Sequence, residues 1–248
     1  MTQPHIHLSA DLGVRHAILP GDPGRIDRIL PFLSQVRELG FHREYRSALG
    51  LYQGLPVLAM STGMGGASMG IAVEELRNIG VTAAVRIGSC GALQPGIGLG
   101  DQILVTGAVR DDGASQSYAP AQYPGVPDLD LLWHCRQASD AQEIPYHLGL
   151  CRSHDSFYID NSEEISTFWS GKGILGADME TAALFTVGRL RGLRCASILN
   201  NVVIWGESTG GSIGAYSAGE DMTAVGEQRE ISIALEALYR LSQTDEER

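Results

Sequence analysis

Short apolar runs of strand length alternate along this chain with longer segments of helical periodicity. The runs that predict strands are Val14–Leu19, Tyr45–Tyr52, Leu55–Ser61, Ala83–Ile87, Gln102–Val109, Tyr146–Cys151 and Cys195–Ile204. The segments that predict helices are Ile26–Leu33, Ile71–Ile79, Asp128–Ala141, Met179–Leu190 and Met222–Leu241. This alternation predicts an α/β fold whose mixed, largely parallel sheet is covered by helices on both faces.

The length and composition are those of an ordinary folded domain. The chain has 248 residues, of which 44% are hydrophobic and 19% are charged. These values are typical of a soluble globular protein with a substantial core. Because no linker interrupts the pattern, we expect a single domain over residues 1–248, with residues 242–248 as a frayed polar tail.

The net charge, the lengths of the apolar stretches, the cysteines and the histidines argue against several classes of function. A formal net charge of -11 without any basic block argues against nucleic acid or an anionic membrane as a partner. The N-terminus lacks the pattern of a signal peptide, and no apolar stretch approaches the roughly 20 residues that span a bilayer. Four cysteines without a Cys-x-x-Cys pair indicate reduced thiols in a cytoplasmic protein. The histidines show no metal-ligand spacing, so we expect no metal site.

Arg25 is a first candidate ligand for an anion. It ends the glycine-rich turn Gly21–Arg25, between a predicted strand and a predicted helix. Glycine lets the backbone approach a ligand closely, and a helix N-terminus offers unpaired N–H groups to an anion. The alternative is a tight turn that carries a solvated arginine.

Arg86 is a second candidate, because it lies inside the otherwise apolar strand Ala83–Ile87. A buried guanidinium needs a carboxylate, carbonyl groups or an anionic ligand. Ser89 follows in a glycine-flanked turn and offers a hydroxyl and a backbone N–H to the same anion. A buried ion pair is the alternative interpretation.

An acidic pair opens the apolar helix that follows Gly176. Asp178 and Glu180 stand where acids often cap the first turn of a helix. The functional alternative is that Glu180 accepts hydrogen bonds from two neighbouring hydroxyls, such as those of a ribose.

The segment Gly66–Gly70 supports a rival hypothesis. It matches the Gly-x-Ser-x-Gly pattern of a hydrolase nucleophile elbow. That fold requires a catalytic histidine late in the chain, whereas the last histidine here is His154. A hydrolase is therefore the weaker hypothesis, and the same glycines make no clean dinucleotide-binding pattern.

Taken together, these segments resemble the uridine phosphorylase and hexameric purine nucleoside phosphorylase family. The motifs that carry the resemblance are Leu19–Arg25, His42–Tyr45, Arg86–Ala92, Val109–Ser115 and Asp178–Ala182. It implies a three-layer α/β/α fold and a pentosyltransferase that uses phosphate, without a cofactor, to cleave the glycosidic bond of a nucleoside. It also implies a homo-oligomer, either a dimer or a trimer of dimers, with sites shared between subunits.

The resemblance also implies roles for individual residues. Arg86 and Glu180 would carry the catalysis. Phosphate would be held by Gly21, Arg25, Arg86 and Ser89, with Arg43 reaching in from a neighbouring subunit. Ribose would be held by Met179 and Glu180, with His7 of the neighbour. Base contacts would come from Cys90, Gly91, Phe157, Asn161 and Val202.

Base recognition is where the chain departs from the family pattern. Asn161 and Glu163 replace a glutamine and an arginine of the uridine branch, and Trp205 replaces a later arginine. Val202 replaces an aspartate of the bacterial purine branch. An acid would repel the carbonyl oxygens of uracil. The base therefore stays open between uridine-like and purine nucleosides, with a non-catalytic nucleoside-binding relative or a hydrolytic nucleosidase as alternatives.

Overall fold

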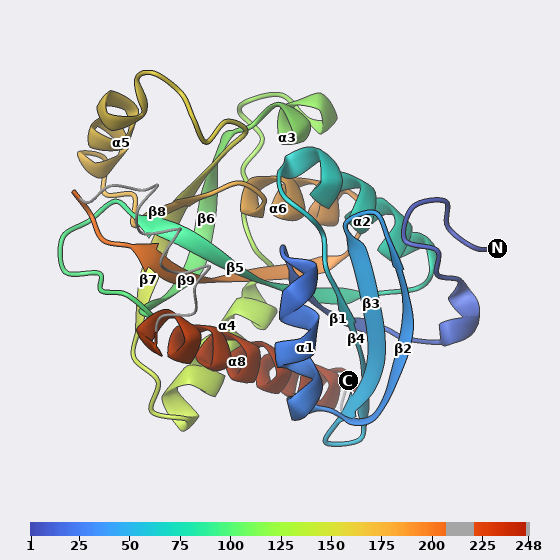
Figure 1. The fold of residues 1–248 in the computed structure, drawn as a ribbon. Coiled ribbons are helices and arrows are strands. Elements are labelled where there is room, and N and C mark those ends of the chain that lie inside the picture. The colour runs from blue at the N-terminus through green and yellow to red at the C-terminus, as the bar shows by residue number, and fades with distance from the viewer. Residues whose placement is uncertain (207–220, 247–248) are drawn as a thin grey trace.

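The computed structural model describes residues 1–206 and 221–246. In these residues one nine-stranded sheet has the order β2-β3-β4-β1-β5-β8-β7-β6-β9, and β5 also pairs with β9 (Figure 1). The strands are β1 His16–Pro20, β2 Ser34–His42, β3 Tyr45–Tyr52, β4 Leu55–Met60, β5 Ala83–Ala92, β6 Gln102–Asp111, β7 Tyr146–His154, β8 Gly176–Asp178 and β9 Arg194–Val203. The helices are α1 Ile26–Ile29, α2 Gly66–Asn78, α3 Gly113–Tyr118, α4 Leu129–Ala141, α5 Ser162–Ser170, α6 Thr181–Leu190 and α8 Asp221–Glu246, with short 3-10 turns at Ala10–Leu12, Pro23–Arg25 and Leu30–Phe32.

The sheet is mixed, as the sequence predicts. Parallel pairs join β1 to β4 and β5, β5 to β9, and β7 to β6 and β8. Antiparallel pairs join β3 to β2 and β4, β5 to β8, and β6 to β9. The central strands β1 and β5 are buried on both faces, which accounts for their continuous apolar runs.

Helices cover both faces of the sheet (Figure 1). On one face α2, α3 and α6 pack over a core that includes Met69 and Phe185. On the other face α1, α4 and α8 pack over a second core that includes Ile29, Leu131 and Leu238. The predicted three-layer α/β/α architecture is confirmed.

Several elements differ from the sequence prediction for identifiable reasons. The helix expected over Ile26–Leu33 ends at Ile29 and tightens into a 3-10 turn, because Pro31 has no N–H to continue an α-helix. The edge strand β2 was missed because most of its side chains are exposed and it has no apolar run. The short elements α3, α5 and β8 were missed as well.

The C-terminal helix α8 is longer than its polar end suggests. Residues 242–248 were expected to be frayed, but α8 continues to Glu246. Ser242 is buried, and Asp245 accepts hydrogen bonds at 2.9 and 3.0 Å from Nη1 of Arg194. These contacts hold a segment that composition alone assigns to a loose tail. No helix in the described ranges has the length and apolar character needed to cross a membrane.

Candidate active site

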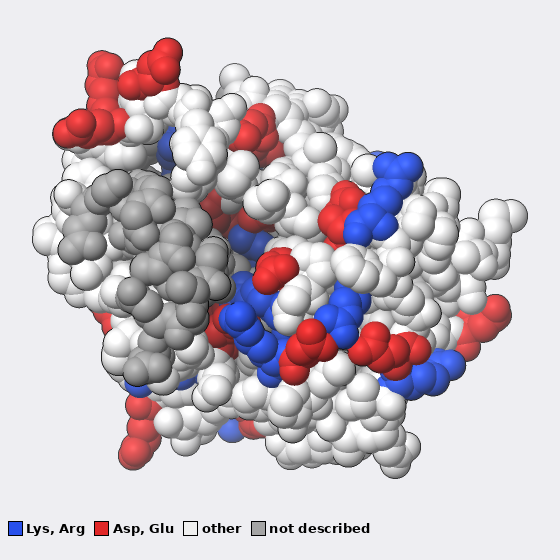
Figure 2. Space-filling model, in the orientation of Figure 1, with Lys and Arg blue, Asp and Glu red and all other residues white. Residues whose placement is uncertain are grey.

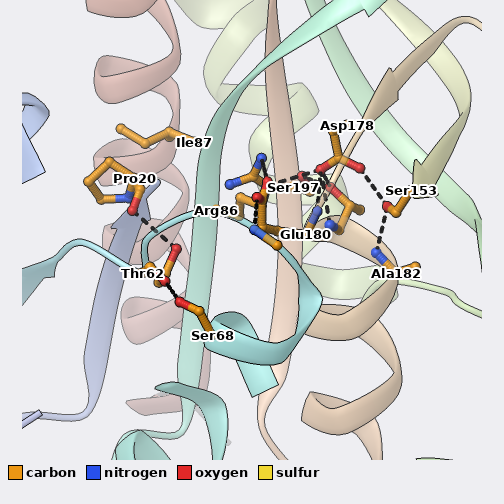
Figure 3. Close-up of polar contacts among 12 residues, drawn as sticks. Pro20, Thr62, Ser68, Arg86, Ile87, Ser153, Asp178, Glu180, Ala182 and Ser197 are labelled. Carbon is orange, nitrogen blue, oxygen red and sulfur yellow. Dashed lines mark hydrogen bonds and ion pairs between the residues drawn. The ribbon is translucent and has the colours of Figure 1, made fainter. Parts of the chain in front are cut away.

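Arg86 lies on β5 in the middle of the sheet. Its neighbours Val85 and Ile87 belong to the core on the α8 side of the sheet. Arg86 points to the other side of the strand, as Figure 3 shows for Arg86 and Ile87. Its side chain is only 3% exposed. The alternation of a β-strand therefore puts a buried guanidinium on the α2 and α6 side of the sheet.

Two carboxylates hold this guanidinium (Figure 3). Nε of Arg86 donates to Oδ2 of Asp178 at 3.2 Å, and Nη2 donates to Oε2 of Glu180 at 2.6 Å. Nη1 is buried and has no acceptor among the described residues. A buried donor without a partner costs about 1–3 kcal/mol, so the site favours an added acceptor. The structure thus contains the ion pair and leaves one nitrogen for a ligand.

Asp178 caps helix α6. Its Oδ2 accepts hydrogen bonds from N of Thr181 at 3.0 Å and from Oγ1 of Thr181 at 2.5 Å. Its Oδ1 accepts from Oγ of Ser153 at 2.5 Å, and the same hydroxyl accepts from N of Ala182 at 2.9 Å (Figure 3). The capping role that the sequence left open for the acidic pair therefore belongs to Asp178.

Glu180 makes no capping hydrogen bond and is buried beside Arg86 instead. Its Oε1 accepts from the backbone N of Gly65 at 2.5 Å, while Oε2 binds Arg86. Burial raises the pKa of Glu180, and the positive charge of Arg86 offsets only part of that effect. Burial lowers the pKa of Arg86, but attraction to Glu180 and Asp178 outweighs it, so the net shift is upward. Burial and the attraction between opposite charges therefore act on both pKa values in opposite directions.

The turn that begins at Gly21 lies next to Nη1 of Arg86. In the parallel pair of β1 and β5, Pro20 stands opposite Ile87, so Gly21 follows at the end of β1, beside the middle of β5. A Cβ added to Gly21 would lie 4.0 Å from Nη1 of Arg86. Ser89 is half-buried further along β5. Gly21 and the guanidinium of Arg86 therefore meet at the carboxyl end of β1, and the carboxyl ends of parallel strands are where open α/β sheets bind ligands.

The geometry suits a small anion next to a ligand that carries hydroxyl groups. Among the comparisons with known proteins, the family model of the Phosphorylase superfamily matches residues 15–201, which include Gly21, Arg86 and Glu180. The chain belongs to this superfamily.

Individual relatives narrow the family further. The chain is 34% identical to a uridine phosphorylase of Thermococcus kodakarensis, over 99% of this chain and 89% of the relative. It is 37% identical to a guanosine phosphorylase of Halorubrum lacusprofundi, over 79% of this chain and 81% of the relative. A crystal structure of uridine phosphorylase from Vibrio fischeri, complexed with 6-hydroxy-1-naphthoic acid, matches with a TM-score of 0.89 and 43% identity, covering 96% of this chain and 97% of that one. The predicted family, fold and enzyme class, a nucleoside phosphorylase, are confirmed.

Arg25 is placed differently from the other residues that are predicted to bind phosphate. It is buried rather than solvated, and it lies on the α8 side of β5. Its Nε donates to Oε1 of Glu227 at 2.8 Å, and Nη2 donates to Oε1 of Glu230. Nη1 donates to the carbonyl of Ile87 at 3.3 Å. Arg25 therefore contacts the same strand as Arg86 but from the opposite face.

The two residues assigned to a neighbouring subunit are exposed. His7 stacks on His42 with ring centroids 3.7 Å apart, and Arg43 follows directly. Both His7 and Arg43 have a φ of 55°. In this chain neither contacts Arg86 or Glu180 through a hydrogen bond, so their predicted roles depend on a second subunit.

The predicted base contacts come from three places. Cys90 and Gly91 continue β5, and a Cβ on Gly91 would lie 3.6 Å from Cβ of Val203, next to the buried Val202. Phe157 is half-buried and packs edge-on against Tyr158, with ring centroids 4.9 Å apart. Asn161 is exposed before α5, and Met179 is half-buried between Asp178 and Glu180. Cys90, Val202 and Val203 are buried and apolar, so they offer a base no polar side chain.

Two buried asparagines of β9, Asn200 and Asn201, bind backbone carbonyl groups. Nδ2 of Asn200 donates to the carbonyl of Thr223 at 2.9 Å. Nδ2 of Asn201 donates to the carbonyl of Gly98 at 2.9 Å. Their amide nitrogens therefore tie β9 to its surroundings and are not directed at a base.

The rival hydrolase pattern finds no support. Ser68 lies inside α2, and its hydroxyl donates to the carbonyl of Thr62 (Figure 3). It is not exposed on a strand-to-helix turn, as a nucleophile elbow requires. In the described residues no group of three His, Cys, Asp or Glu side chains is arranged to hold a metal ion.

Sequence reasoning missed four residues that contact the predicted site residues. Gly65 binds Glu180 through its backbone, and Gly88 leaves room for the guanidinium of Arg86. Glu227 and Glu230 bind Arg25 from α8. The two glutamates had a sequence signal, because they continue the apolar stripe of a helix toward Ile231 and Ala234.

Proposed function

We propose that this chain cleaves a nucleoside by phosphorolysis, with phosphate bound beside Nη1 of Arg86, Gly21 and Ser89. The observation that carries this proposal is the buried Nη1, which has no acceptor among the described residues. The same guanidinium holds Glu180, so one residue links the anion site to the carboxylate that would bind ribose. No metal or organic cofactor takes part in this proposal.

The chemistry follows from that pairing. An oxygen of phosphate forms a bond to C1′ of the ribose while the bond from C1′ to the base nitrogen breaks. The ribose acquires oxocarbenium character, and the base leaves with the bonding electrons and takes up a proton. Arg86 orients the phosphate, and Glu180 accepts hydrogen bonds from the 2′ and 3′ hydroxyls. The products are a free base and ribose 1-phosphate.

Local charge supports anion binding in an acidic protein. The net charge is -11, so the average field repels phosphate. Figure 2 shows basic side chains gathered around the position of α1, interspersed with acidic ones. Attraction of phosphate therefore has to come from individual arginines close to the site, because salt screens charges over about 10 Å.

The base is the open part of the proposal. The relatives include uridine phosphorylases and a guanosine phosphorylase. Asn161 and Glu163 are both exposed, and Val203, which lies against Gly91, is apolar. Apolar side chains contact the ring of a pyrimidine or a purine without reading its edge. We therefore propose a uridine-like or purine nucleoside.

The assembly and the location belong to the same proposal. A homo-oligomer, a dimer or a trimer of dimers, would bring His7 and Arg43 of one subunit to the site of its neighbour. The exposure of both side chains supports this arrangement. Four buried free cysteines support a reducing, cytoplasmic compartment, where the reaction would serve nucleoside catabolism and salvage.

Gly88 provides a test of the placement of Arg86. A Cβ at this position would lie 2.4 Å from Nη2 and 2.6 Å from Cζ of Arg86. We expect Gly88→Ala to displace the guanidinium and to raise KM for phosphate at least about tenfold, because an error of about 1 Å can cost ~100-fold. Steady-state kinetics at varied phosphate measure the effect. Gly40→Ala is the control, since a Cβ there meets nothing within 4 Å; equal phosphate KM values for both variants would contradict the placement.

The proposed function is tested by base release from uridine, thymidine, inosine, guanosine and adenosine, with and without phosphate. Phosphate-dependent release establishes the reaction and identifies the base. Release that does not depend on phosphate would indicate a nucleosidase. No release, with no reaction of the free bases and ribose 1-phosphate in reverse, would indicate a non-catalytic binding protein.

A further inference from the structure

Two glutamates of α8 surround Arg25 in the interior. The side chains of Arg25, Glu227 and Glu230 are 4%, 1% and 0% exposed. Glu227 uses Oε1 for Arg25 and Oε2 for Arg28, whose side chain is half-exposed. Oε2 of Glu230 is buried and has no hydrogen-bond partner among the described residues. Burying two carboxylates is costly, and one of their four oxygens is left uncompensated, so this cluster is not optimised for stability.

The cluster lies on the α8 side of β5, across the strand from the proposed phosphate site. Arg25 ends the turn that begins at Gly21, and its Nη1 binds the carbonyl of Ile87. Ile87 is adjacent to Arg86 in β5, and the two side chains point to opposite sides of the strand (Figure 3). A single strand therefore separates the guanidinium of Arg25 from the guanidinium that would bind phosphate.

The carboxylates control how much of the charge of Arg25 the phosphate experiences. All three nitrogens of Arg25 already donate, two of them to carboxylates. A guanidinium paired in this way is held in place, and its positive potential is largely cancelled at longer range. Charges this deeply buried are screened little by salt, so the cancellation extends to the phosphate site.

We infer that Glu230, together with Glu227, offsets the positive charge of Arg25 at the proposed phosphate site and thereby sets the phosphate affinity of the enzyme. This inference rests on the proposed function. Removal of one carboxylate charge leaves more of the positive charge of Arg25 uncompensated and raises the positive potential next to Ile87. The higher potential strengthens phosphate binding. Glu230 is a positioning residue, since it acts through Arg25 and touches no substrate.

Glu230→Gln tests the inference, because it removes the charge and keeps the shape of the side chain. We expect KM for phosphate to fall roughly three- to tenfold, as for one charge removed at an effective dielectric constant of about 20. KM for the nucleoside and kcat at saturating phosphate are expected to stay within about twofold, a split that general loosening of the fold would not produce. Glu236→Gln is the matched control on α8, where Glu236 binds Tyr52, Gln53 and Arg240 away from the cluster.

A second variant keeps the inference testable if Glu230→Gln does not fold. Glu227→Gln removes the other carboxylate charge and is expected to lower KM for phosphate in the same way. An unchanged or higher KM for phosphate in a folded variant, beside an active wild-type enzyme, would overturn the inference alone. Absence of phosphate-dependent cleavage in the wild-type enzyme would instead overturn the proposed function.

Discussion

Arg86→Lys is expected to lower kcat/KM for phosphate by about 10²- to 10³-fold, the usual cost of losing one preorganised donor to a reacting anion. Lysine keeps a positive charge near Asp178 and Glu180 but loses the planar fork. The fork matters because Nε and Nη2 bind two different carboxylates, while Nη1 has no acceptor among the described residues and would bind the phosphate. Initial rates at varied phosphate, with nucleoside saturating, measure the loss.

The lysine variant is a cleaner test than alanine. Arg86→Ala would leave Asp178 and Glu180 buried without their counter-charge, and breaking such a pair typically destabilises a protein by ~3–5 kcal/mol. Arg191→Lys is the matched control, since Arg191 binds Glu74 at the surface. Phosphorolysis at the wild-type rate in Arg86→Lys, with unchanged dependence on phosphate, would show that Nη1 holds no anion.

Glu180→Gln is expected to lower kcat/KM about ten- to a hundredfold for ribonucleosides, because a hydrogen bond to a charged group contributes roughly 1.5–3 kcal/mol. The loss for 2′-deoxyribonucleosides is expected to be smaller, since one hydroxyl that Glu180 would bind is absent. The ratio of kcat/KM for matched ribose and deoxyribose substrates measures this difference. Equal losses on both substrates would contradict a ribose contact.

The same variant has a pH signature. Only the ionised Glu180 accepts two hydroxyl hydrogen bonds, and burial raises the pKa of its carboxyl. Activity should therefore be full above that raised pKa and fall as the pH decreases through it. The resulting acid limb lies above the range of an ordinary glutamate, and Glu180→Gln should lack it. Glu74→Gln serves as a surface control; persistence of the limb in Glu180→Gln would assign it to another group.

Local patterns in the sequence determined much of the architecture. Strands β3 and β4, and helix α4 after Asp128, agree with the prediction because each depends on residues close in the chain. The prediction failed where local signals were weak. Strand β2 has mostly exposed side chains, and it forms because β3 offers it an edge to pair with.

The candidate site could also be predicted from the sequence only in part. An arginine inside an apolar strand and an acid at the start of an apolar helix identify Arg86 and Glu180 from sequence alone. The sequence could not decide between a buried ion pair and an anion ligand. The tertiary structure shows the ion pair, in which two nitrogens of Arg86 bind carboxylates, and it leaves the third without an acceptor among the described residues. It also separates Asp178, which caps α6, from Glu180, which does not.

The sequence by itself determined the fold class, the family and the residue types of the site, because periodicity and motifs are encoded over short distances along the chain. Only the tertiary structure decided the partners of those residues. Arg25 meets Glu227 across 202 positions of sequence, and Arg86 meets Glu180 across 94. Such pairs form because the packing of helices on the two faces of the sheet brings distant segments together, and no local pattern specifies which charges will meet.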